Sequence, residues 1–172
     1  MKETAEDDLG GYKQMNKIEL TYLTWVNIED YCKKLANLIK NSDFKPEIIV
    51  GIQRGGCITG VLLSHLLNIE DFCTIGIRTT KSDDIRAQRV KPVIYDSFSV
   101  QLVNGKKVLL TDDITDTGVT LIEAKKELLK FGCKEVKSAT IIRAPASVGK
   151  VDFYAKEVKP WVVFPWEIKI YK

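Results

Sequence analysis

Three aspartates lie in one short stretch, VLLTDDITDTGVTL at residues 108–121, between an apolar run and a helical pattern. The acids are Asp112, Asp113 and Asp116, and Gly118 follows them closely. A helix that begins near Gly118 would offer unpaired backbone N–H groups and the positive end of its dipole, which together bind anions. Hydroxyl donors are interleaved with the acids: Thr115, Thr117 and Thr120. The stretch therefore predicts a phosphate site.

Carboxylates beside a phosphate repel it unless a neutral or cationic group lies between them. Ribose hydroxyls donate hydrogen bonds to carboxylates, and Mg²⁺ prefers oxygen ligands while keeping several of its waters. We therefore expect a sugar phosphate and Mg²⁺ here. Asp112 and Asp113 are adjacent at a predicted strand end, so their side chains are expected to diverge. One is expected to face the ribose, and the other to serve the water shell of the metal or a basic partner.

Known phosphate-binding and capping motifs fit this stretch less well. A Walker-type loop needs the pattern GxxxxGK[ST], and the turn contains no lysine. A dinucleotide-binding fingerprint needs GxGxxG, whereas residues 51–56 are GIQRGG. A phosphatase of the haloacid dehalogenase type would carry two aspartates two residues apart after its first strand. A plain helix cap uses one acid rather than three. A site for a sugar phosphate is the better interpretation.

Strands alternate with helices along the chain. Short apolar runs, typical of strands buried on both faces, predict strands at residues 47–52, 72–78, 106–111 and 136–143. Helical periodicity predicts a helix from an N-cap at Asn27 to Lys40, one after the glycines at 55–56, and one from Gly118 that stops at Gly132. This order predicts an α/β fold with a mostly parallel central sheet flanked by helices.

In such sheets, ligands bind outside the carboxyl ends of the strands. Three turns that carry glycine or aspartate are expected to meet there, at residues 51–56, 78–91 and 111–120. Residues 79–91 show no apolar periodicity and include several lysines and arginines. They are predicted to form a mobile basic loop that closes over the site and excludes water.

The composition suits one globular domain of 172 residues, 45% of them hydrophobic, with a net charge of +3. That charge suits an anionic small molecule as well as nucleic acid. Residues 1–16 are acidic and are expected to form a loose tail without a signal peptide, followed by a domain at 17–172. The four cysteines form no CxxC pair, which favours reduced thiols in the cytoplasm. No apolar stretch approaches the ~18 residues that cross a membrane.

Three stretches carry a resemblance to the type I phosphoribosyltransferases, over about residues 20–170. VLLTDDITDTGVTL resembles the phosphoribosyl pyrophosphate (PRPP) signature of that family. VGIQRGG, at residues 50–56, resembles its pyrophosphate loop. PWVVFPWE, at residues 160–167, resembles the C-terminal segment of the xanthine–guanine branch. The resemblance implies the type I phosphoribosyltransferase fold with a small C-terminal segment that binds the base.

The resemblance also implies a role for each stretch. The 5-phosphate would lie against the turn formed by Thr115, Asp116, Thr117, Gly118, Val119 and Thr120. Asp112 and Asp113 would address the ribose hydroxyls, and through them or through water the metal. The backbone at Arg54 and Gly55 would bind pyrophosphate with Mg²⁺. Asp116 would lie near N7 of a purine and accept or relay its proton, as the catalytic residue.

The reaction implied is displacement of pyrophosphate from PRPP by N9 of a purine base, which gives a nucleoside monophosphate in purine salvage. Trp161 would stack on the purine and the backbone at Val162 would meet the base edge, whereas Trp25 and Trp166 are interpreted as structural. The family's lysine for the 6-oxygen is replaced by Ala144, with Arg143 one residue earlier.

A 6-oxopurine (hypoxanthine, guanine or xanthine) is expected as the substrate, with Arg143 a candidate to replace the lysine; adenine stays an alternative. A regulator that only senses PRPP is a second alternative; such a protein would be expected to carry an added DNA-binding domain or an unusually basic face, and to lose an acid from the turn. We expect a homodimer with neither nucleic acid nor a membrane as partner.

Overall fold

A computed structural model of the chain describes residues 19–80, 88–97, 102–145, 147, 151–159 and 161–167, so the predicted tail at 1–16 lies outside the described residues. The elements in chain order are β1 (Leu20–Tyr22), α1 (Trp25–Lys40), β2 (Ile48–Gln53), α2 (Gly55–Leu67), β3 (Phe72–Thr80), β4 (Arg89–Asp96), β5 (Lys107–Thr115), α3 (Val119–Lys130), β6 (Glu135–Arg143), β7 (Phe153–Glu157) and β8 (Trp161–Val163).

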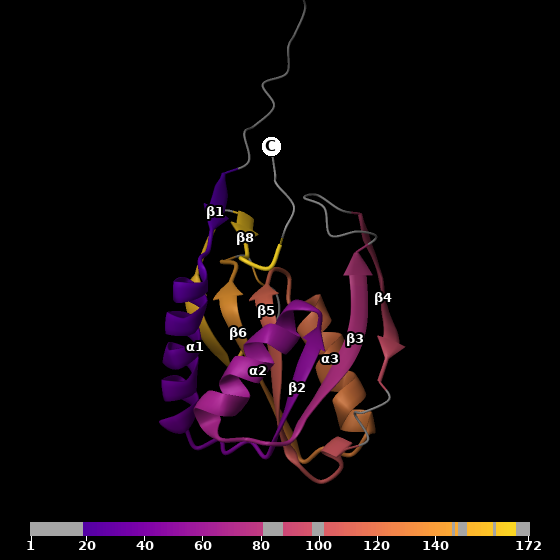
Figure 1. Cartoon of the computed structure of the whole chain (residues 1–172). Helices are drawn as coiled ribbons and strands as arrows, with labels where there is room; N and C mark the ends of the chain where they lie inside the picture. Colours follow the sequence, from indigo (N-terminus) through magenta and orange to yellow (C-terminus); the bar gives the residue numbers. More distant parts are fainter. Residues whose placement is uncertain are drawn as a thin grey trace, which may run out of the picture.

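The central sheet has six strands in the order β4-β3-β2-β5-β6-β7, and every pairing is parallel except that of β3 with β4. Helices α1 and α2 cover one face and α3 covers the other (Figure 1). Side chains of successive residues in the central strands point to opposite faces of the sheet. On β5, Leu109 packs in the core under α1 and α2, and Leu110 packs in the core under α3. The predicted α/β architecture is therefore confirmed.

The predicted N-cap of the first helix is wrong by three residues. Helix α1 is capped by Thr24, whose hydroxyl accepts a hydrogen bond from the Asn27 N–H at 3.2 Å. The Thr24 N–H donates in return to the Asn27 side-chain oxygen at 2.9 Å. Two cap-forming residues three positions apart form a reciprocal capping box, in which the earlier residue is the cap. Asn27 is therefore the third residue of the helix.

The prediction of a loop over 79–91 is also partly wrong. Strand β3 continues to Thr80 and β4 begins at Arg89, while residues 81–87 lie outside the described part of the chain. Strand β4 pairs antiparallel with β3 at the edge of the sheet, and Ile94 packs against the core under α3. Only one face of this strand is buried, and Pro92 is tolerated because an edge strand needs no ladder bonds on its outer side.

The C-terminal segment is held by the N-terminal one. Strands β1 and β8 form a separate two-stranded parallel sheet, with Leu20 opposite Trp161 and Tyr22 opposite Val163 (Figure 1).

No helix in the described residues is long and apolar enough to span a bilayer.

Candidate active site

The candidate site lies at the carboxyl ends of the central strands, where α2 and α3 begin. Strand β5 continues through both acids to Thr115, four residues beyond the predicted end at 111. The extension is stabilised by β6, because Asp112 pairs with Thr140 and Thr115 pairs with Arg143 along the parallel ladder. The two adjacent acids are therefore held by a strand rather than by a turn.

Asp113 faces the N-terminus of α2. A Cβ atom placed on Gly55 would lie 1.7 Å from the Asp113 Oδ2 atom, so the carboxylate occupies the space that this glycine leaves. Its other oxygen accepts the Ile114 N–H at 2.8 Å. Asp112, the preceding strand residue, accepts the Asp113 N–H with its carboxylate at 3.0 Å, and a side-chain hydrogen bond joins the two carboxyl groups. The two carboxyl groups therefore lie close together, and the expectation that adjacent positions would make them diverge is wrong.

Both acids have pKa values above the ordinary range of an aspartate. Burial, followed by the charge of Asp113, raises the pKa of Asp112 well above its ordinary value. Burial raises the pKa of Asp113 to about 6, and the nearby Glu167 carboxylate adds to this rise. Within the described part of the chain, neither acid has an ion-pair partner. A cation bound beside them would relieve this repulsion, so the donor set fits Mg²⁺.

The Arg54–Gly55 turn begins α2 directly against β5. A Cβ atom on Gly56 would lie 2.3 Å from the Thr111 carbonyl oxygen, so the helix start packs against strand backbone. Arg54 is the N-cap residue and provides no side-chain cap bond. The first N–H groups of α2 therefore lack a side-chain cap, which suits an anion.

The 115–120 turn begins α3 in the same way. Gly118 is the N-cap residue at a φ of +79°, a left-handed conformation that favours glycine, and it makes no side-chain cap bond. Thr120, in the first turn of the helix, has its hydroxyl 3.2 Å from the Thr79 hydroxyl of β3. Asp116 is exposed, whereas the Thr115 hydroxyl is buried and has no hydrogen-bond partner among the described residues. The remaining predicted residues of the turn are Thr117, which is half-buried, and Val119, which is exposed.

Strand β8 brings the predicted base-binding residues to the same end of the sheet (Figure 1). The Trp161 N–H donates to the Glu19 carbonyl at 3.1 Å, and the Val163 carbonyl accepts from the Leu23 N–H at 2.9 Å. In a parallel ladder the intervening residue turns its N–H and C=O away from the partner strand. The backbone of Val162 is therefore directed away from β1, while the Trp161 side chain is 39% exposed.

Arg143 is turned towards β7. Its guanidinium forms an ion pair with Glu157, and its Cζ atom lies 4.2 Å from the centre of the Tyr154 ring. These two contacts hold the Arg143 side chain beside the neighbouring strand, away from the acids of β5.

Glu167 is the site residue that the sequence reasoning missed. Its carboxylate accepts the Phe164 N–H at 3.0 Å and lies close enough to Asp113 to raise the pKa of that acid. The available signal was an acid at the end of the PWVVFPWE segment, which was interpreted for its aromatic residues alone. Trp166 in that segment stacks on Phe164 and contacts Trp25, with ring centres 4.7 and 5.8 Å apart.

Residues 20–172 match the model of the phosphoribosyl transferase domain family. The chain belongs to this family. It is 31% identical over 124 residues to the xanthine-guanine phosphoribosyltransferase of Cereibacter sphaeroides, covering 71% of this chain and 70% of that one. It is 27% identical over 155 residues to the hypoxanthine-guanine phosphoribosyltransferase of Saccharomyces cerevisiae, covering 81% and 68%.

Among solved structures, this transferase resembles a purine phosphoribosyltransferase from Pyrococcus horikoshii. The TM-score is 0.72 at 32% identity, and the match covers 89% of this chain and 97% of that one. The resemblance stated from the PRPP signature and the C-terminal segment is thereby confirmed at the level of family and fold.

Proposed function

We propose that this transferase is a purine phosphoribosyltransferase of nucleotide salvage, which transfers the ribose 5-phosphate of PRPP to N9 of a 6-oxopurine. The observation that carries the proposal is the placement of two helix N-termini, whose N-cap residues make no side-chain cap bond, on either side of two adjacent carboxylates. PRPP has the matching pattern, because its two anionic ends are separated by a ribose diol. The names of the similar proteins support the purine as acceptor.

In this proposal the 5-phosphate binds the 115–120 turn and pyrophosphate binds the Arg54–Gly55 turn. The ribose hydroxyls donate to Asp112 and Asp113, since carboxylates accept from diols. The same acids, with Glu167 nearby, would hold Mg²⁺ through the ribose hydroxyls or water. When bound, the ion would neutralise charge on the departing pyrophosphate.

The reaction breaks the bond from the anomeric carbon to pyrophosphate and forms a bond from that carbon to N9. Positive charge that develops on the ribose ring is stabilised by the carboxylates of Asp112 and Asp113. Asp116 is exposed at the start of the 115–120 turn, and its carboxylate would accept or relay the purine proton. The product is the nucleoside monophosphate.

Strand β8 reads the base in this proposal. Trp161 stacks on the purine, and the backbone N–H and C=O of Val162 meet its edge, as their direction away from β1 supports. Arg143 would have to leave Glu157 and Tyr154 to reach the 6-position of the purine. We therefore assign the discrimination between purines to the backbone of Val162. Adenine is the competing substrate.

We further propose a cytoplasmic homodimer. The cytoplasm is supported by the free thiols of the chain, since disulfides are rare in that compartment. Sedimentation at micromolar concentration tests the dimer, and a monomer would refute it.

The function is tested by mixing the protein with Mg²⁺, PRPP and one purine at a time, followed by separation of the monophosphate. We expect product with hypoxanthine, guanine or xanthine. Product with adenine alone would overturn the choice of base, and no product with any purine would overturn the proposed function.

A further inference from the structure

The paired strands β3 and β4 contact Gln53, the residue before the Arg54–Gly55 turn, and Thr120 of the 115–120 turn. They form one edge of the sheet, with β4 outermost (Figure 1). Their pairing is irregular in two places, between Gly76 and Ile77 and between Arg78 and Thr80. Such irregularities re-aim side chains and are frequent near active sites.

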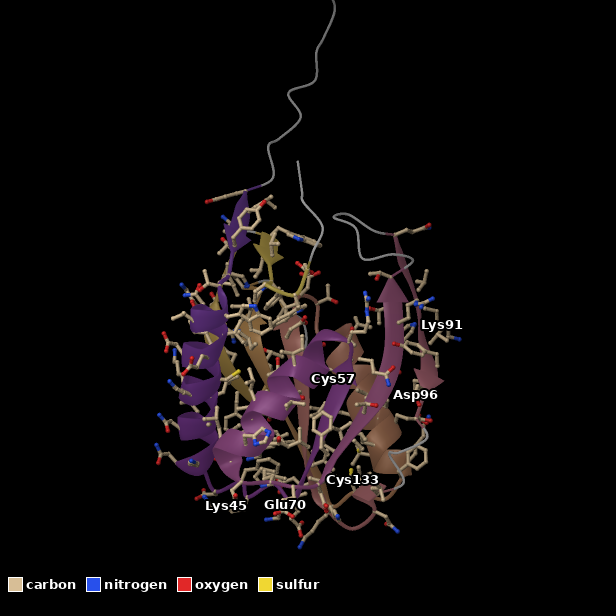
Figure 2. The ribbon with its side chains drawn as sticks, viewed as in Figure 1. Lys45, Cys57, Glu70, Lys91, Asp96 and Cys133 are labelled. Carbon is tan, nitrogen blue, oxygen red and sulfur yellow. The ribbon has the colours of Figure 1, made fainter. Side chains whose placement is uncertain are left out.

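The first contact reaches the Arg54–Gly55 turn through the residue that precedes it. The Gln53 side-chain amide donates to the Thr74 hydroxyl of β3 at 3.0 Å and to the Asp96 carboxylate of β4 at 2.5 Å. Figure 2 shows Asp96 on β4. The first irregularity places Asp96 opposite Gly76, within reach of β2. Two acceptors, one of them charged, fix the Gln53 amide and with it the end of β2.

The second contact reaches the 115–120 turn from the other side. The Thr79 hydroxyl lies 3.2 Å from the Thr120 hydroxyl, and Thr79 sits at the second irregularity of the pairing. A threonine hydroxyl has one proton to donate, and its direction is set by its neighbours. When Thr79 donates to Thr120, the Thr120 proton is left to point to a bound phosphate.

We propose that these two contacts position the two anion-binding turns separately, with Gln53, Asp96 and Thr79 as positioning residues. The contact of Gln53 with Asp96 and Thr74 sets the affinity for pyrophosphate. The contact of Thr79 with Thr120 sets the affinity for the 5-phosphate. This inference rests on the proposed function, which assigns one anionic group to each turn.

The test measures two ligands that each report one turn. Pyrophosphate occupies the Arg54–Gly55 turn alone, and the nucleoside monophosphate product occupies the 115–120 turn without pyrophosphate. Asp96→Ala should raise the dissociation constant of pyrophosphate about tenfold and leave that of the monophosphate within about twofold. Thr79→Val should do the reverse, by a similar factor, because it removes one hydroxyl and keeps the side-chain shape.

Conservative variants serve as controls. Asp96→Asn keeps an oxygen that accepts from Gln53, and Thr79→Ser keeps the hydroxyl, so both should bind the two ligands nearly as the wild type does. If Asp96→Ala does not fold, Gln53→Met removes the same contact from the other partner. Equal weakening of both ligands in one variant, or no weakening in either, would overturn the inference. A wild-type protein that turns over no purine would instead overturn the proposed function.

Discussion

Gly55 and Gly56 are adjacent, but alanine at each position should damage a different property of the protein. Neither has a positive φ, so alanine fits the backbone at both positions. The difference lies in what the new Cβ atom would meet. At Gly55 it is 1.7 Å from a side-chain oxygen of Asp113, and at Gly56 it is 2.3 Å from the backbone oxygen of Thr111.

Gly55→Ala should leave the fold intact and impair the site. With ordinary contact near ~3.5 Å, the Asp113 oxygen must move by roughly 1.8 Å, which rotation of its side chain supplies. That rotation takes the carboxylate away from the proposed ribose and metal position. Loss of one charge-assisted contact, about 1.5–3 kcal/mol, corresponds to a fall in kcat/KM for PRPP of roughly 10- to 100-fold. The melting temperature should stay within about 2 °C, because alanine in a first helical turn is not unfavourable.

Gly56→Ala should instead destabilise the whole domain. The Thr111 carbonyl belongs to the buried strand β5, so about 1.2 Å of extra separation must come from moving α2 off the sheet. Overpacking of this kind costs about 1–3 kcal/mol, and a domain of this size loses about 2–4 °C of melting temperature per kcal/mol. A fall of roughly 2–12 °C is therefore expected.

The assay has two parts. Each variant is melted thermally, and its steady-state kinetics are measured with PRPP as the varied substrate, at a temperature well below the melting range. The reasoning would be refuted if Gly55→Ala melted several degrees below the wild type with normal kcat/KM. It would equally be refuted if Gly56→Ala kept the wild-type melting temperature.

The site residues lead to four more predictions. Asp116→Asn should keep PRPP binding but lower kcat by about 100-fold or more, and wild-type turnover would remove Asp116 from catalysis. Trp161→Ala should raise KM by a similar factor for every accepted purine, since stacking is worth roughly 1–3 kcal/mol whatever the base; a change for one purine alone would contradict stacking. Arg143→Ala should leave the kinetics nearly unchanged, and Ala144→Lys should sharpen the preference for 6-oxopurines. Selective loss of activity with 6-oxopurines in Arg143→Ala would mean that Arg143 recognises the base. Burial raises the pKa of Asp113 to about 6, so the fold without substrate should gain stability as this acid is protonated below that pH. The KM for PRPP should rise over the same pH range, and a KM that is constant from about pH 7 to 5 would contradict this.

Local patterns in the sequence were sufficient for the architecture and for most of the proposed site. Apolar runs of strand length that alternate with helical periodicity predict a parallel sheet, because each element must bury its own apolar residues. The glycines before α2 and α3 and the acids of β5 lie within a few residues of those elements. Topology alone then brings these glycines and acids together, because all the parallel strands have their carboxyl ends on the same side of the sheet.

Tertiary structure decided which partners these residues have. The sequence offered Arg143 as a cation for the base, but pairing of β6 with β7 places Glu157 beside it. It likewise gave no reason to connect Gln53 with Asp96, 43 positions later, or Glu167 with Asp113. Such contacts depend on strand register and on irregular pairing at the sheet edge, and these are set by packing between distant segments. A periodic pattern within one segment carries no information about which residue of another segment will lie opposite it.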